Sequence, residues 1–269
     1  MPCHICVQCG IEFGERASPP PGCAICQDIR QYVRWAGQAW TTLEELRASH
    51  AAHLDMDHGL LGIGSKPSFA IGQRALLVPD RSGNILWDCI SLLDDAIINR
   101  IKGQGGLRAI AISHCHYYTT MISWSEAFGD VPIYLHEDNR KWVQRQDRRI
   151  EYWTGEKLVL TPHSALYRVP GHFSGGTILH WTEGAGTKGA LMSGDIIQVT
   201  QDRRFVSFMY SYPNMIPVSI KTVRRIGEIV GPLVFDRVYG AFWNRVIASD
   251  ANKAFHASIR RYIEAIEGD

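Results

Sequence analysis

The sequence lacks a long apolar run, an excess of charge of either sign and a recognisable export signal. None of its apolar stretches approaches the roughly 20 residues that a membrane-spanning helix requires. The first ten residues have neither the basic region nor the apolar core of a secretory signal. Lys and Arg number 28 against 27 Asp and Glu, with no dense basic patch. We therefore expect neither a nucleic-acid partner nor a membrane partner.

Cysteine is scarce outside the N-terminal segment, since five of the seven cysteines lie within the first 26 residues. An odd number clustered at one end does not suggest a disulfide framework, so we expect a reducing, cytoplasmic setting. Apolar residues make up 45% of the 269-residue chain, which is enough to form a full core. This length fits one large domain with a small appendage.

The N-terminal segment contains two Cys-x2-Cys pairs that are separated by thirteen residues. Each pair can turn tightly enough to direct two thiolates at one ion, and two pairs complete a tetrahedral S4 site. The predicted ligands of this structural metal are Cys6, Cys9, Cys23 and Cys26. Zinc is the default ion, although iron fits the same ligands, as in rubredoxin, and Cys3 can compete with Cys6. We interpret residues 1–40 as a rubredoxin-like zinc ribbon with a structural role.

The segment that follows is predicted to be a helical linker over residues 41–65. Thr42 and Glu45 have the spacing of a capping box at a helix start. Trp35 and Trp40 are candidate anchors that pack this part of the chain against the main domain.

Residues 66–269 read as alternating strands and helices in which adjacent strand pairs are frequent. Residues 107–113 form a continuous apolar strand of the kind that is buried on both faces, and residues 217–230 have a helical pattern. The predicted fold class is α/β (α+β), a mixed-sheet sandwich with helices outside.

Four candidate metal ligands each follow a predicted strand in this domain. His114 and His116 end the strand at 107–113, His172 lies in a glycine-rich loop, and Asp195 ends the apolar run at 190–194. Three imidazoles and one carboxylate are an ordinary catalytic ligand set for a borderline metal such as zinc.

In the order and spacing of these residues, the chain resembles the metallo-β-lactamase superfamily over most of residues 65–269. The family's leading motif His-x-His-x-Asp-His corresponds here to "HCHYYT", its Gly-His loop to "PGHFSGG" and its Gly-Asp turn to "SGD". The resemblance implies an αββα sandwich with metal at one sheet edge. Tyr118 and Thr119 replace two ligands of the family's second metal, and no histidine lies near the expected late position in "VYGAFWN". The resemblance therefore implies one catalytic ion, zinc or ferrous iron.

The hypothesis is a metal-dependent hydrolase that acts on a small-molecule ester, thioester or amide through a mononuclear metal-bound water. Asp195 is either the fourth ligand or a base on that water. Tyr118 is expected to donate a hydrogen bond to substrate. Tyr210, Tyr212 and Asn214 are candidate substrate contacts, with an aromatic packing loop as the open alternative for their segment.

Two other functions stay open. His114, His172 and Asp195 can form the two-histidine, one-carboxylate face of a ferrous site, which resembles persulfide dioxygenases of the same superfamily. The chain can also be a binding or scaffold protein without turnover. The remaining histidines considered are expected to be structural, with a reservation for His53 and His58: His50, His53, His58, His136, His163, His180 and His256.

Overall fold

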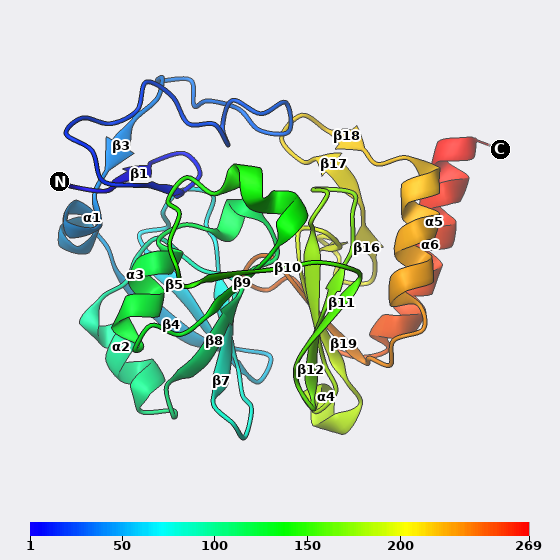
Figure 1. Cartoon of the computed structure of the whole chain (residues 1–269). Helices are drawn as coiled ribbons and strands as arrows, with labels where there is room; N and C mark the ends of the chain where they lie inside the picture. The colour runs from blue at the N-terminus through cyan, green and yellow to red at the C-terminus, as the bar shows by residue number, and fades with distance from the viewer. Residues whose placement is uncertain (269) are drawn as a thin grey trace. The chain divides into compact units, whose positions relative to one another are not determined.

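The computed structural model describes residues 1–268, which divide into two units. The first unit consists of Met1–Leu135 and Asn139–Trp153, and the second of His136–Asp138 and the residues from Thr154 onward. Each unit has its own main β-sheet and its own helices (Figure 1). No helix among residues 1–268 is both long enough and apolar enough to span a membrane.

The first unit begins with a small antiparallel sheet in the order β2-β1-β3, made of β1 (His4–Cys6), β2 (Glu12–Phe13) and β3 (Trp40–Thr41). Trp40 packs edge-on against Phe13 within this small sheet, with ring centroids 5.1 Å apart, and its role as an anchor against the main domain stays a prediction. The same prediction is wrong for Trp35, whose side chain is 101% exposed. Trp35 lies in a turn-rich loop that pairs with no strand, so no sheet face covers it.

Residues 41–65 are only partly helical. Helix α1 (Leu43–Ser49) begins with the predicted capping box between Thr42 and Glu45. The helical prediction is wrong beyond Ser49, because β4 (Ala51–Asp57) and β5 (Leu60–Lys66) form a hairpin. Its two-residue turn, His58-Gly59, has positive φ at both positions, the geometry that matches the twist of a tight hairpin.

The main sheet of the first unit has seven strands in the order β10-β9-β8-β7-β6-β5-β4. Its remaining strands are β6 (Ala75–Val78), β7 (Asn84–Trp87), β8 (Leu107–Ala111), β9 (Ile133–His136) and β10 (Ile150–Trp153). The predicted strand at 107–113 is confirmed as β8, with its last three residues buried. Strands β7, β8 and β9 are parallel, so the loops after them leave from one edge of the sheet.

Short helical segments connect these strands: α2 (Asp95–Lys102), the 3₁₀ turn η1 (Cys115–Tyr117), α3 (Met121–Ala127) and the 3₁₀ turn η2 (Glu137–Trp142). Asp94 caps α2 by accepting a hydrogen bond from the Ile97 backbone N–H at 2.9 Å. The candidate histidines His114 and His116 follow β8 at its carboxyl end.

The second unit has a six-stranded sheet in the order β11-β12-β13-β14-β19-β20, antiparallel except for the parallel pair β14–β19. Its strands are β11 (Lys157–Thr161), β12 (Ser164–Arg168), β13 (Thr177–Trp181), β14 (Ala190–Gly194), β19 (Arg237–Gly240) and β20 (Val246–Ile247). Two small ribbons pair β15 (Gln198–Val199) with β16 (Val206–Ser207), and β17 (Met209–Ser211) with β18 (Ile216–Pro217).

Helices of the second unit are α4 (Gly184–Thr187), α5 (Ile220–Val230) and α6 (Ala251–Glu267), of which α5 and α6 lie side by side (Figure 1). The helix predicted at 217–230 starts at Ile220, after Ser219 caps its first turn. Val223, Ile226 and Val230 recur at helical spacing and are buried in the core. Burial of each such side chain is worth about 1.5–3 kcal/mol, so α5 is held mainly by its apolar face.

Candidate metal centres

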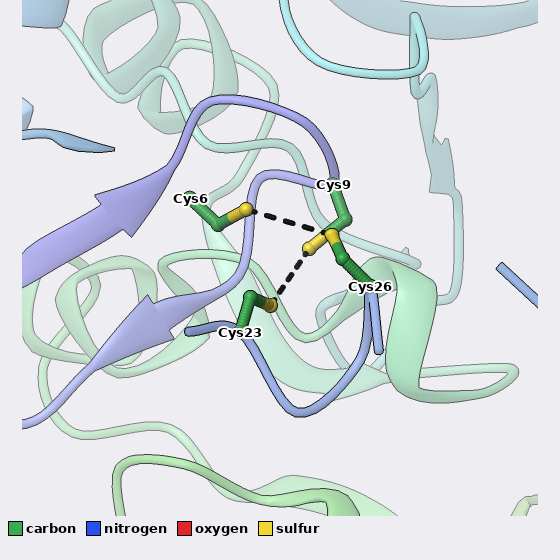
Figure 2. A group of neighbouring side chains, drawn as sticks. All are labelled: Cys6, Cys9, Cys23 and Cys26. Atoms are coloured by element: carbon green, nitrogen blue, oxygen red, sulfur yellow. Dashed lines mark hydrogen bonds between the residues drawn. The ribbon is translucent and has the colours of Figure 1, made fainter. Parts of the chain in front are cut away.

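The four N-terminal cysteines converge on one point, with their sulfur atoms turned toward each other (Figure 2). The Sγ atoms of Cys6 and Cys26 are 3.6 Å apart, as are those of Cys9 and Cys23. Four sulfurs at the usual zinc distance of about 2.3 Å define a tetrahedron with edges of about 3.8 Å. The cluster therefore has the size of an S4 metal site and is compatible with the predicted zinc ribbon.

Backbone turns and an amide shape this cluster. Gly10, with φ of +81°, closes the first turn by donating to the Cys6 carbonyl at 2.8 Å, and a Cβ at Gly10 would lie 2.5 Å from Ser91 Oγ. Gln38 donates to Cys6 Sγ at 3.2 Å and accepts from the Cys23 N–H at 3.3 Å. Such donors favour the thiolate form that a metal requires.

All four thiols of the cluster are buried, and Cys3 lies outside it. The sulfurs that lie together are therefore those of the four predicted ligands, with Cys6 and not Cys3 among them. Hydrogen bonding from the Cys23 thiol lowers the pKa of Cys6, while burial raises the pKa of Cys9. Metal binding to such a set releases protons and stabilises the folded segment.

In the first unit, the candidate ligands His114 and His116 face each other. His114 Nε2 and His116 Nδ1 are 3.1 Å apart, and the two side chains are 0% and 2% exposed. Two imidazoles that share a tetrahedral zinc at about 2.0–2.1 Å place their nitrogens about 3.3–3.4 Å apart. This pair therefore has the geometry of one edge of a metal site.

In each ring of this pair the outer nitrogen, which is the one turned away from the other histidine, also has a polar neighbour. His114 Nδ1 lies 2.9 Å from Ser113 Oγ, and His116 Nε2 lies 3.1 Å from Gln31 Nε2. Asp88, which directly follows β7, accepts a 2.7 Å hydrogen bond from the Ser113 backbone N–H. Partners at the outer nitrogen orient the ring and fix which nitrogen can bind metal.

In the second unit, His172 lies in the loop between β12 and β13. Its Nδ1 lies 3.2 Å from the Met209 carbonyl and 3.0 Å from the Tyr210 carbonyl, so Nδ1 carries the proton and donates. This tautomer leaves Nε2 as the atom that can bind a metal. The loop depends on Gly176, because a Cβ there would lie 2.8 Å from the Val169 carbonyl.

Asp195 follows β14 in the second unit and is 4% exposed. Burial raises the pKa of its carboxyl to about 7. Tyr212 donates a 2.9 Å hydrogen bond to the Asp195 backbone carbonyl, and its ring centroid is 5.5 Å from that of His172. Burying an ionised carboxylate costs free energy unless a cation or hydrogen bonds compensate its charge. A bound metal ion would provide such compensation.

The two positions that lack second-metal ligands have packing roles in the first unit. Tyr118 is 2% exposed, and burial raises its pKa well above the usual range while a hydrogen bond with Asn139 opposes this shift. Thr119, with φ of +32°, accepts a hydrogen bond at its carbonyl from the Glu12 N–H of β2. The substrate contact predicted for Tyr118 stays a prediction.

The three candidate substrate contacts lie on or beside the β17–β18 ribbon of the second unit. Tyr210 packs against the hydrophobic core of that unit, and Asn214 is exposed in the turn, where its N–H donates to Ser211 Oγ at 3.1 Å. Tyr212 is the member that contacts both His172 and the Asp195 carbonyl. Their substrate roles stay predictions.

Several other histidines make contacts of a structural kind. His180 Nε2 lies 2.8 Å from the Val234 carbonyl, and His136 Nε2 lies 3.0 Å from the Gly155 carbonyl. His53 is part of β4, and His58 occupies the exposed hairpin turn that follows it.

The sequence interpretation missed the residues that support the histidine pair: Gln31, Ser113 and Asp88. Asp88 had a usable signal, since an acidic residue directly after an apolar strand belongs at the same sheet edge as the histidines. The two uncharged side chains carry no comparable signal in a single sequence.

Comparison with known proteins shows a relative in sequence and several likenesses in fold. The chain is 45% identical over 273 residues to the Bacillus subtilis (strain 168) protein described as uncharacterized protein YmaE, and the match covers 100% of this chain and 98% of that protein. No family model matches the sequence.

Among solved structures, the chain is similar to the metallo-β-lactamase TMB-1, with a TM-score of 0.56, 12% identity and coverage of 79% of this chain and 99% of that one. It is also similar to a B3 metallo-β-lactamase with an active-site glutamic acid, at a TM-score of 0.51, 16% identity and coverage of 73% and 85%. The metallo-β-lactamase SMB-1 in complex with mercaptoacetic acid gives a TM-score of 0.51, 18% identity and coverage of 73% and 90%. These likenesses show the metallo-β-lactamase fold, which confirms the predicted fold class.

Proposed function

Because the chain belongs to the family of Bacillus subtilis YmaE and has the metallo-β-lactamase fold, we propose that it is a metal-dependent hydrolase. One ion would be held by His114, His116, His172 and Asp195. The three histidines occur in the order in which the superfamily supplies its first-site ligands, and Asp195 takes the place of the superfamily's bridging aspartate.

The observation that carries this proposal is the geometry of the histidine pair. His114 Nε2 and His116 Nδ1 are 3.1 Å apart, while Ser113 and Gln31 engage the outer nitrogens of the same rings. At this distance the two inner nitrogens can share a hydrogen bond in the absence of metal, and an ion of tetrahedral geometry could take the place of that proton. In the second unit, the Nδ1–H of His172 donates to backbone carbonyls, which favours metal binding through Nε2.

A single divalent ion at this site would acidify a water molecule and polarise the oxygen of the bond to be broken. Asp195 would either complete the ligand set or accept a proton from that water. Its carboxylate would reduce the positive charge of the site, since three neutral imidazoles leave the charge of the ion unchanged. Tyr118 and Thr119 supply no ligand for a second ion, so the proposed chemistry is mononuclear.

The proposed substrate is a small molecule with an ester, thioester or amide bond. Tyr212 is the best placed of the candidate substrate contacts, because it lies beside His172 and holds the backbone of Asp195. Tyr118, Tyr210 and Asn214 remain proposed contacts with weaker support, and a cytoplasmic setting remains part of the proposal.

The cysteine cluster would hold a second, purely structural ion, with zinc as the proposed metal. Its four buried sulfurs match an S4 tetrahedron and leave no position for substrate. The same ligands accept iron, so the identity of this ion is part of the test.

A panel of small esters, thioesters and amides, assayed with measured metal content and oxygen uptake, tests the proposed function. We expect hydrolysis without oxygen uptake, abolished in His116→Ala and retained in His256→Ala, an exposed histidine on α6. Oxygen consumption by an iron-loaded chain would instead favour the oxidoreductase. A chain with no ion at the histidines and no turnover would favour a scaffold.

A further inference from the structure

Two buried glutamines connect the cysteine ribbon to the histidine loop within the first unit. Gln31 follows the second cysteine pair, is 9% exposed, and places its Nε2 3.1 Å from His116 Nε2. Gln73 precedes β6, is 6% exposed, and its Nε2 donates to the carbonyls of Cys9 at 2.7 Å and His116 at 3.0 Å. The ring of one candidate ligand is thus held by a side chain of the ribbon segment, and its backbone by a side chain that also holds the ribbon.

We propose that the cysteine ribbon is a positioning element of the histidine site: Gln31 of the ribbon segment selects the tautomer of His116, and Gln73, which bridges the ribbon and the histidine loop, fixes the backbone of His116. This inference rests on the proposed function, because it takes His116 to be a metal ligand. It assigns the ribbon a role beyond its own folding.

The inner contact of the histidine pair determines what Gln31 must do. His116 Nδ1 faces His114 Nε2, so it is the atom of His116 that would bind the ion. A neutral imidazole that offers Nδ1 as a lone pair carries its proton on Nε2. That N–H then needs an acceptor, and Gln31 is the side chain at this nitrogen.

The side-chain amide of Gln31 can form a hydrogen bond with either tautomer of His116, because rotation by half a turn exchanges its carbonyl and its NH₂ group. With its carbonyl toward the ring, it accepts from Nε2–H and leaves Nδ1 available for metal. In this structure the NH₂ group faces the ring. In that orientation it donates to His116 Nε2 and favours the tautomer whose Nδ1 is protonated. Metal binding would therefore be coupled to the orientation of this one amide.

Gln73 has the opposite chemical requirement. Its two acceptors are backbone carbonyls, so only an NH₂ group satisfies both. Two further bonds hold the ribbon: Ser91 Oγ, in the loop after β7, donates to the Gly10 carbonyl at 2.8 Å, and the Glu12 N–H donates to the carbonyl of Thr119, in the histidine loop, at 3.2 Å. The ribbon is therefore attached both to the loop that carries His116 and to the loop after β7.

The two requirements predict opposite results for the same substitution. Gln31→Glu presents only acceptors to His116 Nε2 and should retain metal binding or tighten it. Gln73→Glu places a carboxylate against two carbonyl oxygens, which repel it, and should weaken metal binding. Gln31→Met keeps the length of the side chain without a hydrogen-bonding group, so it tests whether Gln31 only fills space. Gln27→Met, at an exposed position of the same segment, is the matched control.

The experiment is a titration of Co²⁺ into the chain with its ribbon already loaded with zinc, followed by visible absorption. Sulfur-to-cobalt charge-transfer bands would reveal exchange into the ribbon and separate it from binding at the histidines. We expect Gln31→Met and Gln73→Glu to bind Co²⁺ about 10–100-fold more weakly than the wild type, with Gln31→Glu and Gln27→Met at least as tight. His116→Ala should bind none at this site.

Three results would contradict this account in distinguishable ways. Wild-type affinity and spectrum in Gln31→Met and Gln73→Glu, together with loss in His116→Ala, would overturn the positioning role and leave the proposed function intact. Equal weakening in Gln31→Glu and Gln31→Met would show that tautomer selection is wrong. Absence of a histidine-bound Co²⁺ in the wild type would overturn the proposed function and this inference with it.

Discussion

The cysteine cluster and the histidine pair are two candidate metal sites that are built in different ways. The cysteines come from one short stretch of chain, Cys6 to Cys26, and form a complete S4 set within the first unit. The histidine pair supplies two imidazole nitrogens from one loop, and the proposed remaining ligands, His172 and Asp195, come from two later loops of the chain. A complete set of thiolates suits a structural ion, whereas a mixed set can leave a coordination position for water.

The contacts that hold the candidate ligands in place also differ between the two sites, being local at the cysteines and from separate segments at the histidines. Local turns and a single amide, Gln38, maintain the cysteine cluster. The histidine pair is held by side chains that come from three separate segments: Gln31, Asp88 and Ser113. The cysteine site should therefore fail only with its own ligands, while the histidine site should respond to changes elsewhere in the unit.

The largest effect is expected for Cys23→Ser, which removes one of four thiolates from the ribbon. A structural zinc in such a segment contributes roughly 10–16 kcal/mol of apparent binding free energy, so the N-terminal segment should lose its ion and unfold locally. Metal analysis together with hydrogen exchange of residues 1–40 checks this. Cys3→Ser, outside the cluster, should change neither measurement. Unaltered metal content in Cys23→Ser would mean that the ribbon does not bind metal through these four residues.

The next effect is expected for His116→Ala, which should abolish binding at the histidine site and leave the ribbon ion in place. The reason is that the ring supplies an inner nitrogen and the small alanine side chain cannot replace it. Elemental analysis should show one ion fewer per chain than in the wild type, and full metal content would refute the assignment. If the ribbon keeps its ion in His116→Ala, metal binding by the cysteines does not depend on the histidine site.

Whether a feature of the two sites could be predicted from the sequence depends on how far apart its residues lie along the chain. The cysteine cluster was predictable, because two Cys-x2-Cys pairs thirteen residues apart fix both the ligands and their geometry. The order of the histidines and of Asp195 was recognisable through the resemblance to a known superfamily. The β4–β5 hairpin was missed because residues 51–66 contain alanine and glycine with a helix just before them, and only the His58-Gly59 turn reveals it.

The supporting contacts were beyond the reach of one sequence for a physical reason. Gln31 lies 85 positions from His116, and Gln73 joins two carbonyls, which every residue has. Neither contact has a spacing or charge pattern, since both arise only when separate segments fold together.

A smaller effect is expected for Asp195→Asn, which keeps the shape of the side chain and removes its charge. Metal affinity and turnover should each fall by about 10–100-fold, because a neutral amide no longer compensates the charge of the ion. Isothermal titration with Zn²⁺ and an activity assay check this. Wild-type turnover in Asp195→Asn would show that Asp195 is neither ligand nor base.

The smallest effect is expected for Tyr118→Phe, since we assign Tyr118 no ligand role. Loss of the hydrogen bond with Asn139 should cost about 0.5–1.5 kcal/mol of stability, with metal content unchanged. Thermal unfolding and metal analysis check this, with Tyr32→Phe as the exposed control at 43% exposure. Metal loss in Tyr118→Phe would require a tyrosine ligand and a different site.

Anomalous diffraction from crystals of the metal-loaded chain tests the central claim most directly, because it identifies and locates each ion. The claim is that one chain holds two single-ion sites of different kinds. We predict one peak among the four cysteine sulfurs and one peak bound by His114, His116, His172 and Asp195. A pair of peaks about 3.5–4 Å apart at the histidines, or no peak there at full occupancy of the ribbon, would contradict the account.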